Sequence, residues 1–292
     1  MTRDAYVLDE HGLVVFWARK AACTSIVEAI LFDILGQDKD AFGAGGLRKR
    51  PWLNEHGFHY SGKKAARIAK SKGYRSIAMI REPYERLISI FLNAYVLHGG
   101  RPVRQFADVA WFAQNFYCQI TGENPHRRRF AYRGLSFFEF VTAVCDRLDR
   151  HWSHDLRERV VVARTCGRRM AMLPPWPPEP WLNPHWNTQI PARFRDGGFR
   201  YDLLYTTDRS DAFFRRLSDL TGCEISAKRL NASRYARPAE AEPVRDLVRE
   251  NPLSYAEDPM SVNKASYESA ELRARVRRSF SVDYHYLGQS DP

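Results

Sequence analysis

The stretch GLVVFWARKAACTSIVE, residues 12–28, places a short apolar run directly before a sequence with helical character. Between the two lie a lone cation, Lys20, and three small residues, 21–23, followed by the hydroxyls of Thr24 and Ser25. A helix start leaves four backbone N–H groups unpaired and carries the positive end of the helix dipole, so it attracts anions. Small residues allow a ligand to approach that backbone closely. The stretch therefore predicts a strand, an anion-binding loop and a helix.

The same residues also fit a simpler interpretation, in which Thr24 or Ser25 caps a helix after a tight turn and Lys20 is merely solvated. A standard P-loop requires the pattern G-x-x-x-x-G-K-[ST]. Residues 16–28 contain no glycine, and the lysine precedes the small residues instead of following them. The loop is therefore a different phosphate loop, or none.

The composition of the 292-residue chain favours a folded protein with an anionic partner. Its 45 Lys and Arg residues against 34 Asp and Glu residues give a formal net charge of +11, which suits nucleic acids, acidic glycans, nucleotides or membrane surfaces. The five cysteines are odd in number and form no C-x-x-C pair, so neither a zinc site nor a disulfide framework is predicted. The sequence has no run of about 18 apolar residues and no signal-like N-terminus, which favours a cytoplasmic protein.

Strand and helix patterns alternate along the chain. Residues 5–17 are typical of a hairpin that turns at residues 10–12 and leads into the first buried strand, and residues 43–57 of a loop. Further strands are expected at 75–80 and 201–208, and helices at 24–35, 63–73, 83–96, 136–148, 211–222 and within 266–288. Ser136 and Glu139 form a capping-box pattern at one helix start. The alternation favours an α/β fold with a parallel sheet covered by helices on both faces.

A second strand–turn–helix pattern occurs in IREPYERLISIF, residues 80–91. Arg81 stands at the expected strand end, and Ser89 follows eight residues later inside the expected helix. An arginine there can bind a phosphate with two N–H groups, and a serine can add a hydroxyl. Alternatively, Arg81 pairs with Glu82 or Glu85 and the serine faces a neighbouring helix.

Taken together, the two motifs resemble those of sulfotransferases. RKAACTSI, residues 19–26, resembles their 5′-phosphosulfate-binding loop, and IREPYERLISIF closely resembles their 3′-phosphate-binding segment. The resemblance is to the carbohydrate branch, Golgi-type enzymes and bacterial relatives. Three later stretches also fit that branch: NPHWNTQ (183–189), FRYDLLYTTD (199–208) and SFSVDYHYLG (279–288). Two departures are Arg19, where the family often has proline, and NTQ, which replaces a common x-Pro-Gln.

The resemblance implies a P-loop-like three-layer fold, formed by one sulfotransferase domain over residues 1–292. An irregular insertion rich in proline and tryptophan is expected at about 173–191. The implied donor is 3′-phosphoadenosine 5′-phosphosulfate (PAPS), used without a metal. Arg81 and Ser89 would hold its 3′-phosphate, and Lys20 would stabilise the charge that develops as the sulfuryl group leaves. The residues expected at the 5′ end of the donor are Arg19, Lys20, Ala21, Ala22, Cys23, Thr24 and Ser25.

Sulfuryl transfer to an alcohol also needs a base, and histidine is suited to that role near neutral pH. NEHGFHYSG, residues 54–62, contains two histidines. It precedes the 3′-phosphate segment by about the interval at which heparan-type 2-O-sulfotransferases carry a histidine pair implicated in catalysis. The resemblance favours His59 as the base, with His56 in reserve and His185, beside Trp186, as a third candidate. A purely structural histidine is the alternative.

The implied acceptor is a hydroxyl of a carbohydrate or glycoconjugate, including a glycolipid. No nucleic-acid-binding motif supports a nucleic-acid partner. Two alternatives remain at this stage: a non-catalytic nucleotide- or glycan-binding protein on the same fold, and a P-loop-type kinase. The kinase interpretation is weaker because the chain lacks a suitable Gly-Lys-Ser/Thr sequence.

Overall fold

The structure is a computed structural model that describes residues 3–42, 49–99, 101–123, 131–153, 185–190, 194, 199–226, 245–255 and 262–288. The chain forms two compact units. The first comprises Met1–Arg86, Thr188–Arg234 and Val282–Pro292, and the second comprises Leu87–Asn187 and Tyr235–Ser281. The loop after residue 17, Arg81 and His59 all belong to the first unit.

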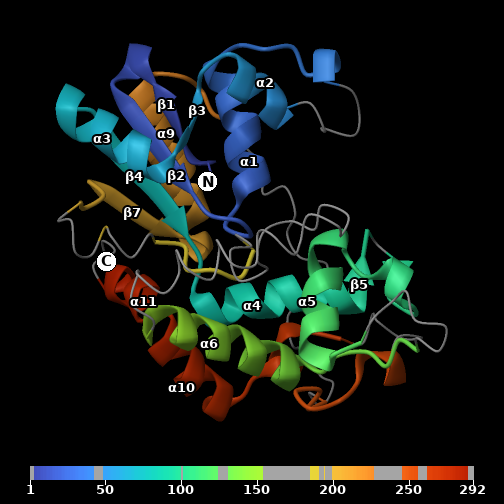
Figure 1. The fold of residues 1–292 in the computed structure, drawn as a ribbon. Coiled ribbons are helices and arrows are strands. Elements are labelled where there is room, and N and C mark those ends of the chain that lie inside the picture. The colour runs from blue at the N-terminus through green and yellow to red at the C-terminus, as the bar shows by residue number, and fades with distance from the viewer. Residues whose placement is uncertain are drawn as a thin grey trace, which may run out of the picture. The chain divides into compact units, whose positions relative to one another are not determined.

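The first unit is built on a five-stranded sheet with the strand order β3-β1-β2-β4-β7 (Figure 1). The strands are β1 (Arg3–Leu8), β2 (Leu13–Trp17), β3 (His59–Ser61), β4 (Arg75–Ile80) and β7 (Leu203–Thr206). β2, β4 and β7 run parallel, as expected, whereas β1 is antiparallel to both β2 and β3. β1 runs the other way because it forms the expected hairpin, which turns through Asp9–His11 and a left-handed Gly12. The carboxyl ends of β2, β3, β4 and β7 therefore lie at one edge.

Helices cover both faces of this sheet, which confirms the three-layer α/β fold (Figure 1). On one face lie α1 (Cys23–Glu28), its continuation as a π-helix (Ala29–Ile34), α2 (Lys49–Glu55) and α9 (Ser210–Thr221). On the other face lie α3 (Gly62–Lys72) and α11 (Ser281–Leu287). The alternation of the strands divides the core, because Tyr6, Val15 and Trp17 face α1 whereas Val14 and Phe16 face α3.

The second unit is largely helical. Its described helices are α4 (Pro83–Phe91), which begins in the first unit and continues as a π-helix (Leu92–Val96), α5 (Trp111–Thr121), α6 (Phe137–Ser153) and α10 (Ala270–Ser279). A two-stranded ribbon, β5 (Leu97–His98) and β6 (Arg101–Pro102), is also present. The expected capping box is formed, since Ser136 Oγ accepts from Glu139 N and the Glu139 carboxylate accepts from Ser136 N. Short 3₁₀ turns in the two units are Asp40–Phe42, Phe106–Asp108, Thr207–Arg209, Pro252–Ser254 and Lys264–Tyr267.

The structure differs from the sequence-based element assignment in several places, among them the unexpected strands β3, β5 and β6. The expected loop at 43–57 contains α2, whose Pro51 lies in the first turn, where proline is tolerated. The expected closing helix within 266–288 is two helices, α10 and α11, because Phe280 leaves the helical conformation between them. Helix α5 was not expected. Of the insertion predicted at 173–191, residues 173–184 and 191 lie outside the described residues.

Candidate functional site

The loop between β2 and α1 has an unusual backbone. Lys20 and Ala22 have φ values of 65° and 53°, and they are the non-glycine residues with positive φ in the part of the chain that the structure describes. A left-handed conformation costs an ordinary residue about 1–2 kcal/mol, and such strain often marks a functional site. Two hydrogen bonds fix the loop locally: Ala21 N donates to Ala18 O at 3.1 Å, and Ile26 N donates to Ala22 O at 3.0 Å.

Two arginines from the start of the second motif hold the loop from outside. Arg86, which is 1% exposed, donates from Nε to the Arg19 carbonyl at 3.1 Å. Arg81 donates from Nη1 to the Lys20 carbonyl at 3.5 Å. Both acceptors are carbonyls, so neither of these two contacts uses a backbone N–H group of the loop. The two sequence motifs therefore meet at the carboxyl edge of the sheet.

Lys20 lies in an environment that disfavours its charge. Burial lowers the pKa of its ammonium to about 8; the neighbouring Cys23 thiol opposes this change and the Arg81 charge adds to it. A nearby anion would reverse the effect, because it stabilises the charged form. Burial also lowers the pKa of Arg81, against the opposing charges of Glu85 and Glu82. The loop thus concentrates positive charge at a partly desolvated position.

The expected alternative for Arg81, pairing with an acidic neighbour, is present as a loose contact. Arg81 Nη2 lies 3.8 Å from Glu85 Oε2. Glu82 is used differently: its carboxylate caps α4 by accepting from Glu85 N at 2.7 Å, and it also accepts from the Tyr284 hydroxyl. Ser89 lies further along α4, in the second unit, and is half-buried.

His59 lies on β3 directly opposite Tyr6 of β1. The His59 ring is 4.9 Å from the Tyr6 ring and 5.9 Å from the Trp17 ring, centroid to centroid. Strand β1 lies between β3 and β2, so His59 approaches β2 only through its ring, which lies near Trp17, the last residue of β2, on the same face of the sheet as α1. The Arg50 guanidinium lies 4.8 Å above the Trp17 ring and adds a cation to this cluster.

Two polar atoms in the His59 cluster have no hydrogen-bond partner among the described residues. They are the Tyr6 hydroxyl and Trp17 Nε1, on side chains that are 0% and 5% exposed. Burial raises the pKa of the Tyr6 hydroxyl, although the Arg50 charge opposes the change. Buried polar atoms usually find partners, so these two are unusual for a core position.

The other two candidate histidines have different surroundings. His56 is exposed in the turn after α2, where its Nδ1 lies 2.9 Å from the Trp52 carbonyl and its ring stacks on Trp52 at 3.9 Å. His185 belongs to the second unit, where its ring stacks on Phe112 at 3.9 Å. Of the histidine pair, the structure therefore places the His59 ring near Trp17, at the end of the strand that leads into the loop, and directs His56 to its own helix.

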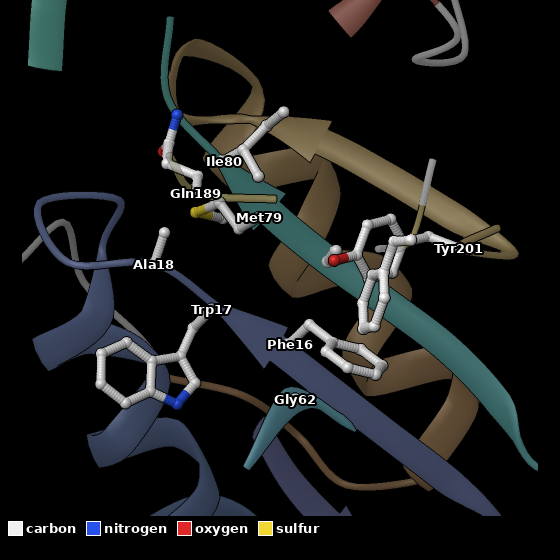
Figure 2. A pocket seen from close by; sticks show the side chains of 10 residues that line it. Phe16, Trp17, Ala18, Gly62, Met79, Ile80, Gln189 and Tyr201 are labelled. Atoms are coloured by element: carbon white, nitrogen blue, oxygen red, sulfur yellow. The ribbon is translucent and has the colours of Figure 1, made fainter. Parts of the chain in front are cut away.

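Figure 2 shows a small cavity at the carboxyl ends of β2 and β4. Phe16 and Trp17 project from opposite sides of β2, Gln189 lies near Met79, and Tyr201 lies near Phe16. The cavity volume of about 10 Å³ is close to the space that one water molecule requires. It is therefore far too small for a nucleotide.

These features define a class of protein: an α/β protein with a strained, cation-bearing loop between a central parallel strand and a helix. Residues 3–167, more than half of the chain, match the model of the sulfotransferase family. The chain belongs to that family and is a PAPS-dependent sulfotransferase. The comparisons with curated proteins and with solved structures gave no significant match. Among the described residues, no cluster of metal-ligating side chains occurs, and no helix is apolar and long enough to span a membrane.

Sequence reasoning missed several residues that contact the motif segments. Gln189 bonds to Arg81, and Asp283 bonds to Gln189. Both lie in stretches that resemble the family, but the sequence analysis gave neither residue a role. Tyr6 and Trp17 contact the His59 ring. The sequence pattern predicted only that they are buried strand residues, so it did not indicate this contact.

Proposed function

We propose that the enzyme transfers the sulfuryl group of PAPS to a hydroxyl of a carbohydrate or glycoconjugate, with the donor bound at the Lys20 loop. The observation that carries this proposal is the loop itself. It holds a half-buried cation in a left-handed conformation at the carboxyl edge of the sheet, and Arg81 contacts its backbone. Ligands of open α/β sheets bind at this edge.

In this proposal the backbone N–H groups of residues 22–25 and the hydroxyls of Thr24 and Ser25 hold the 5′ end of the donor, since the Ala21 N–H is bonded to Ala18 O. Arg81 and Ser89 hold its 3′-phosphate, as their positions in the motif imply. The Lys20 ammonium lies beside the oxygen that bridges phosphorus and sulfur. As the S–O bond to that oxygen breaks, negative charge grows there, and the ammonium stabilises it more in the transition state than in the ground state.

We assign the role of general base to His59. It accepts the proton of the acceptor hydroxyl while the acceptor oxygen forms its bond to sulfur, and 3′-phosphoadenosine 5′-phosphate (PAP) leaves as the second product. The supporting observation is that His59 stands beside Trp17, the residue before the loop, whereas His56 bonds to its own helix. The carbohydrate nature of the acceptor rests on the motif resemblance alone.

Calorimetry with PAP and with ATP tests the donor site. We expect PAP to bind more tightly, because ATP lacks the 3′-phosphate. Arg81→Ala should weaken PAP binding by about 2–5 kcal/mol, the usual loss when one partner of a buried charge pair is removed. Arg75→Ala is the matched control, since Arg75 is exposed at the opposite end of β4. Equal affinity for PAP and ATP in the wild-type protein would contradict the proposal, and turnover with labelled PAPS across neutral and anionic glycans would identify the acceptor.

A further inference from the structure

The backbone of Arg81 is held by one distant side chain. Gln189 Oε1 accepts from Arg81 N at 2.8 Å, and Gln189 Nε2 donates to Arg81 O at 2.6 Å. Both polar backbone groups of Arg81 are thus bonded to a single amide. This contact has a structural reason: the β4 pairings with β2 and β7 end at Met79 and Ile80, so Arg81 has no strand neighbour. Gln189 takes the place of that neighbour.

A buried carboxylate holds Gln189 in turn. Asp283 of α11 is fully buried and accepts from Gln189 N at 2.9 Å and from Ile190 N at 2.9 Å. It also accepts from Gln189 Nε2 at 3.3 Å. Burial raises the pKa of Asp283, while these N–H groups and the Arg86 charge oppose the change. A carboxylate with three N–H donors is a directional anchor, because each donor fixes one lone-pair direction.

The chain of contacts continues into the loop. Arg81 and Arg86, on either side of the start of α4, donate to the carbonyls of Lys20 and Arg19. Asp283 is therefore linked to the loop indirectly in two ways. It holds Gln189, which bonds to the Arg81 backbone, and it interacts electrostatically with Arg86. A shift of Gln189 would move the Arg81 backbone and hence the direction of its guanidinium.

We propose that Gln189 and Asp283 are positioning residues of the donor site. By fixing the Arg81 backbone they direct its guanidinium so that it meets the donor's 3′-phosphate while it contacts the Lys20 carbonyl. The inference rests on the proposed role of Arg81 and goes beyond it, because it assigns a function to the NTQ and VDYHY stretches. It also explains why the glutamine is present here although the proline that often precedes it is not.

The test compares affinity for PAP with affinity for adenosine 5′-phosphate, which lacks the 3′-phosphate. The dissociation constant for adenosine 5′-phosphate, divided by that for PAP, gives a ratio that reports 3′-phosphate recognition alone. Gln189→Met keeps the side-chain volume but removes both hydrogen bonds to the Arg81 backbone and the side-chain bond to Asp283, and we expect it to lower the ratio about tenfold. Asp283→Asn keeps one acceptor oxygen and should lower the ratio less. The matched control is Tyr286→Phe, which removes a 2.6 Å hydrogen bond to the Phe199 carbonyl from the same helix, outside the network. Its ratio should stay at the wild-type value even where its melting temperature falls.

The outcomes separate the two hypotheses. If Arg81→Ala lowers the ratio and Gln189→Met does not, the positioning role is wrong and the donor site stands. If Arg81→Ala itself leaves the ratio unchanged, the 3′-phosphate assignment is wrong and the positioning role falls with it. Should both Gln189→Met and Asp283→Asn fail to fold, hydrogen exchange of the Arg81 amide in the wild-type protein decides. Stronger protection on PAP binding supports the role, and an unchanged rate overturns it.

Discussion

The depressed pKa of Lys20 leads to a measurable prediction: donor binding should take up protons. In the free protein burial lowers this pKa from 10.5 to about 8, so the ammonium loses its proton at a lower pH than an ordinary lysine does. The ammonium is then about one-tenth deprotonated at pH 7, about half at pH 8 and about nine-tenths at pH 9. If the donor places an anion beside Lys20, the pKa returns toward its ordinary value, because the charged form gains a partner.

Donor binding at pH 8 should therefore take up about half a proton per site. For the same reason the affinity for PAP should be about tenfold weaker at pH 9 than at pH 7. Isothermal titration calorimetry of PAP in buffers with different ionisation enthalpies measures the uptake directly, as the slope of observed enthalpy against buffer enthalpy.

Two variants isolate the group. Lys20→Arg keeps the charge but does not titrate in this range, so its slope at pH 8 should vanish. Cys23→Ser removes the neighbouring thiol but keeps Lys20, and it should leave most of the uptake in place. A slope of zero in the wild-type protein at pH 8, or the same slope in Lys20→Arg, would refute the placement of Lys20 beside the donor.

Two further predictions concern the His59 cluster. His59→Ala should reduce turnover by roughly 10²–10⁴-fold, the usual span for a general base, and leave PAP affinity nearly unchanged, whereas His56→Ala should retain most activity. A larger loss of turnover in His56→Ala would assign the role of base to His56. Small losses in both variants, together with an inactive His185→Ala, would assign it to His185. Tyr6→Phe should raise the free energy of unfolding by about 1 kcal/mol, because it removes a buried hydroxyl that has no hydrogen-bond partner among the described residues. Chemical denaturation measures this free energy. A decrease would show that the hydroxyl is hydrogen-bonded in the folded protein.

Much of the first unit could be predicted because its signals are local. The hairpin of β1 and β2, the strand β4 and the helices α3 and α9 each carry their pattern within a dozen residues. Both motif segments also lie where the sequence placed them, since a strand end and a helix start define such a loop. The antiparallel direction of β1 in an otherwise parallel sheet follows from the hairpin.

The choice between the two histidines of residues 54–62 could not be made from periodicity. His56 and His59 are three residues apart, and β3 is only three residues long, too short for strand alternation to show. What separates them is the pairing of His59 with Tyr6, 53 positions earlier in the chain. Long-range pairing leaves no local trace. The same holds for Gln189 and Arg81, which are 108 positions apart.

The absence of glycine from the loop argued against a standard P-loop, and the structure shows how the loop forms without glycine. Lys20 and Ala22 adopt the left-handed conformation that glycine usually supplies, at a cost of about 1–2 kcal/mol each. Glycine at position 20 would relieve the strain but would remove the cation. The strain is instead offset by the hydrogen bonds of Arg81 and Arg86 to the carbonyls of Lys20 and Arg19. Because those arginines lie more than 60 positions along the chain, the conformation of the loop is a tertiary property, and no local pattern could have predicted it.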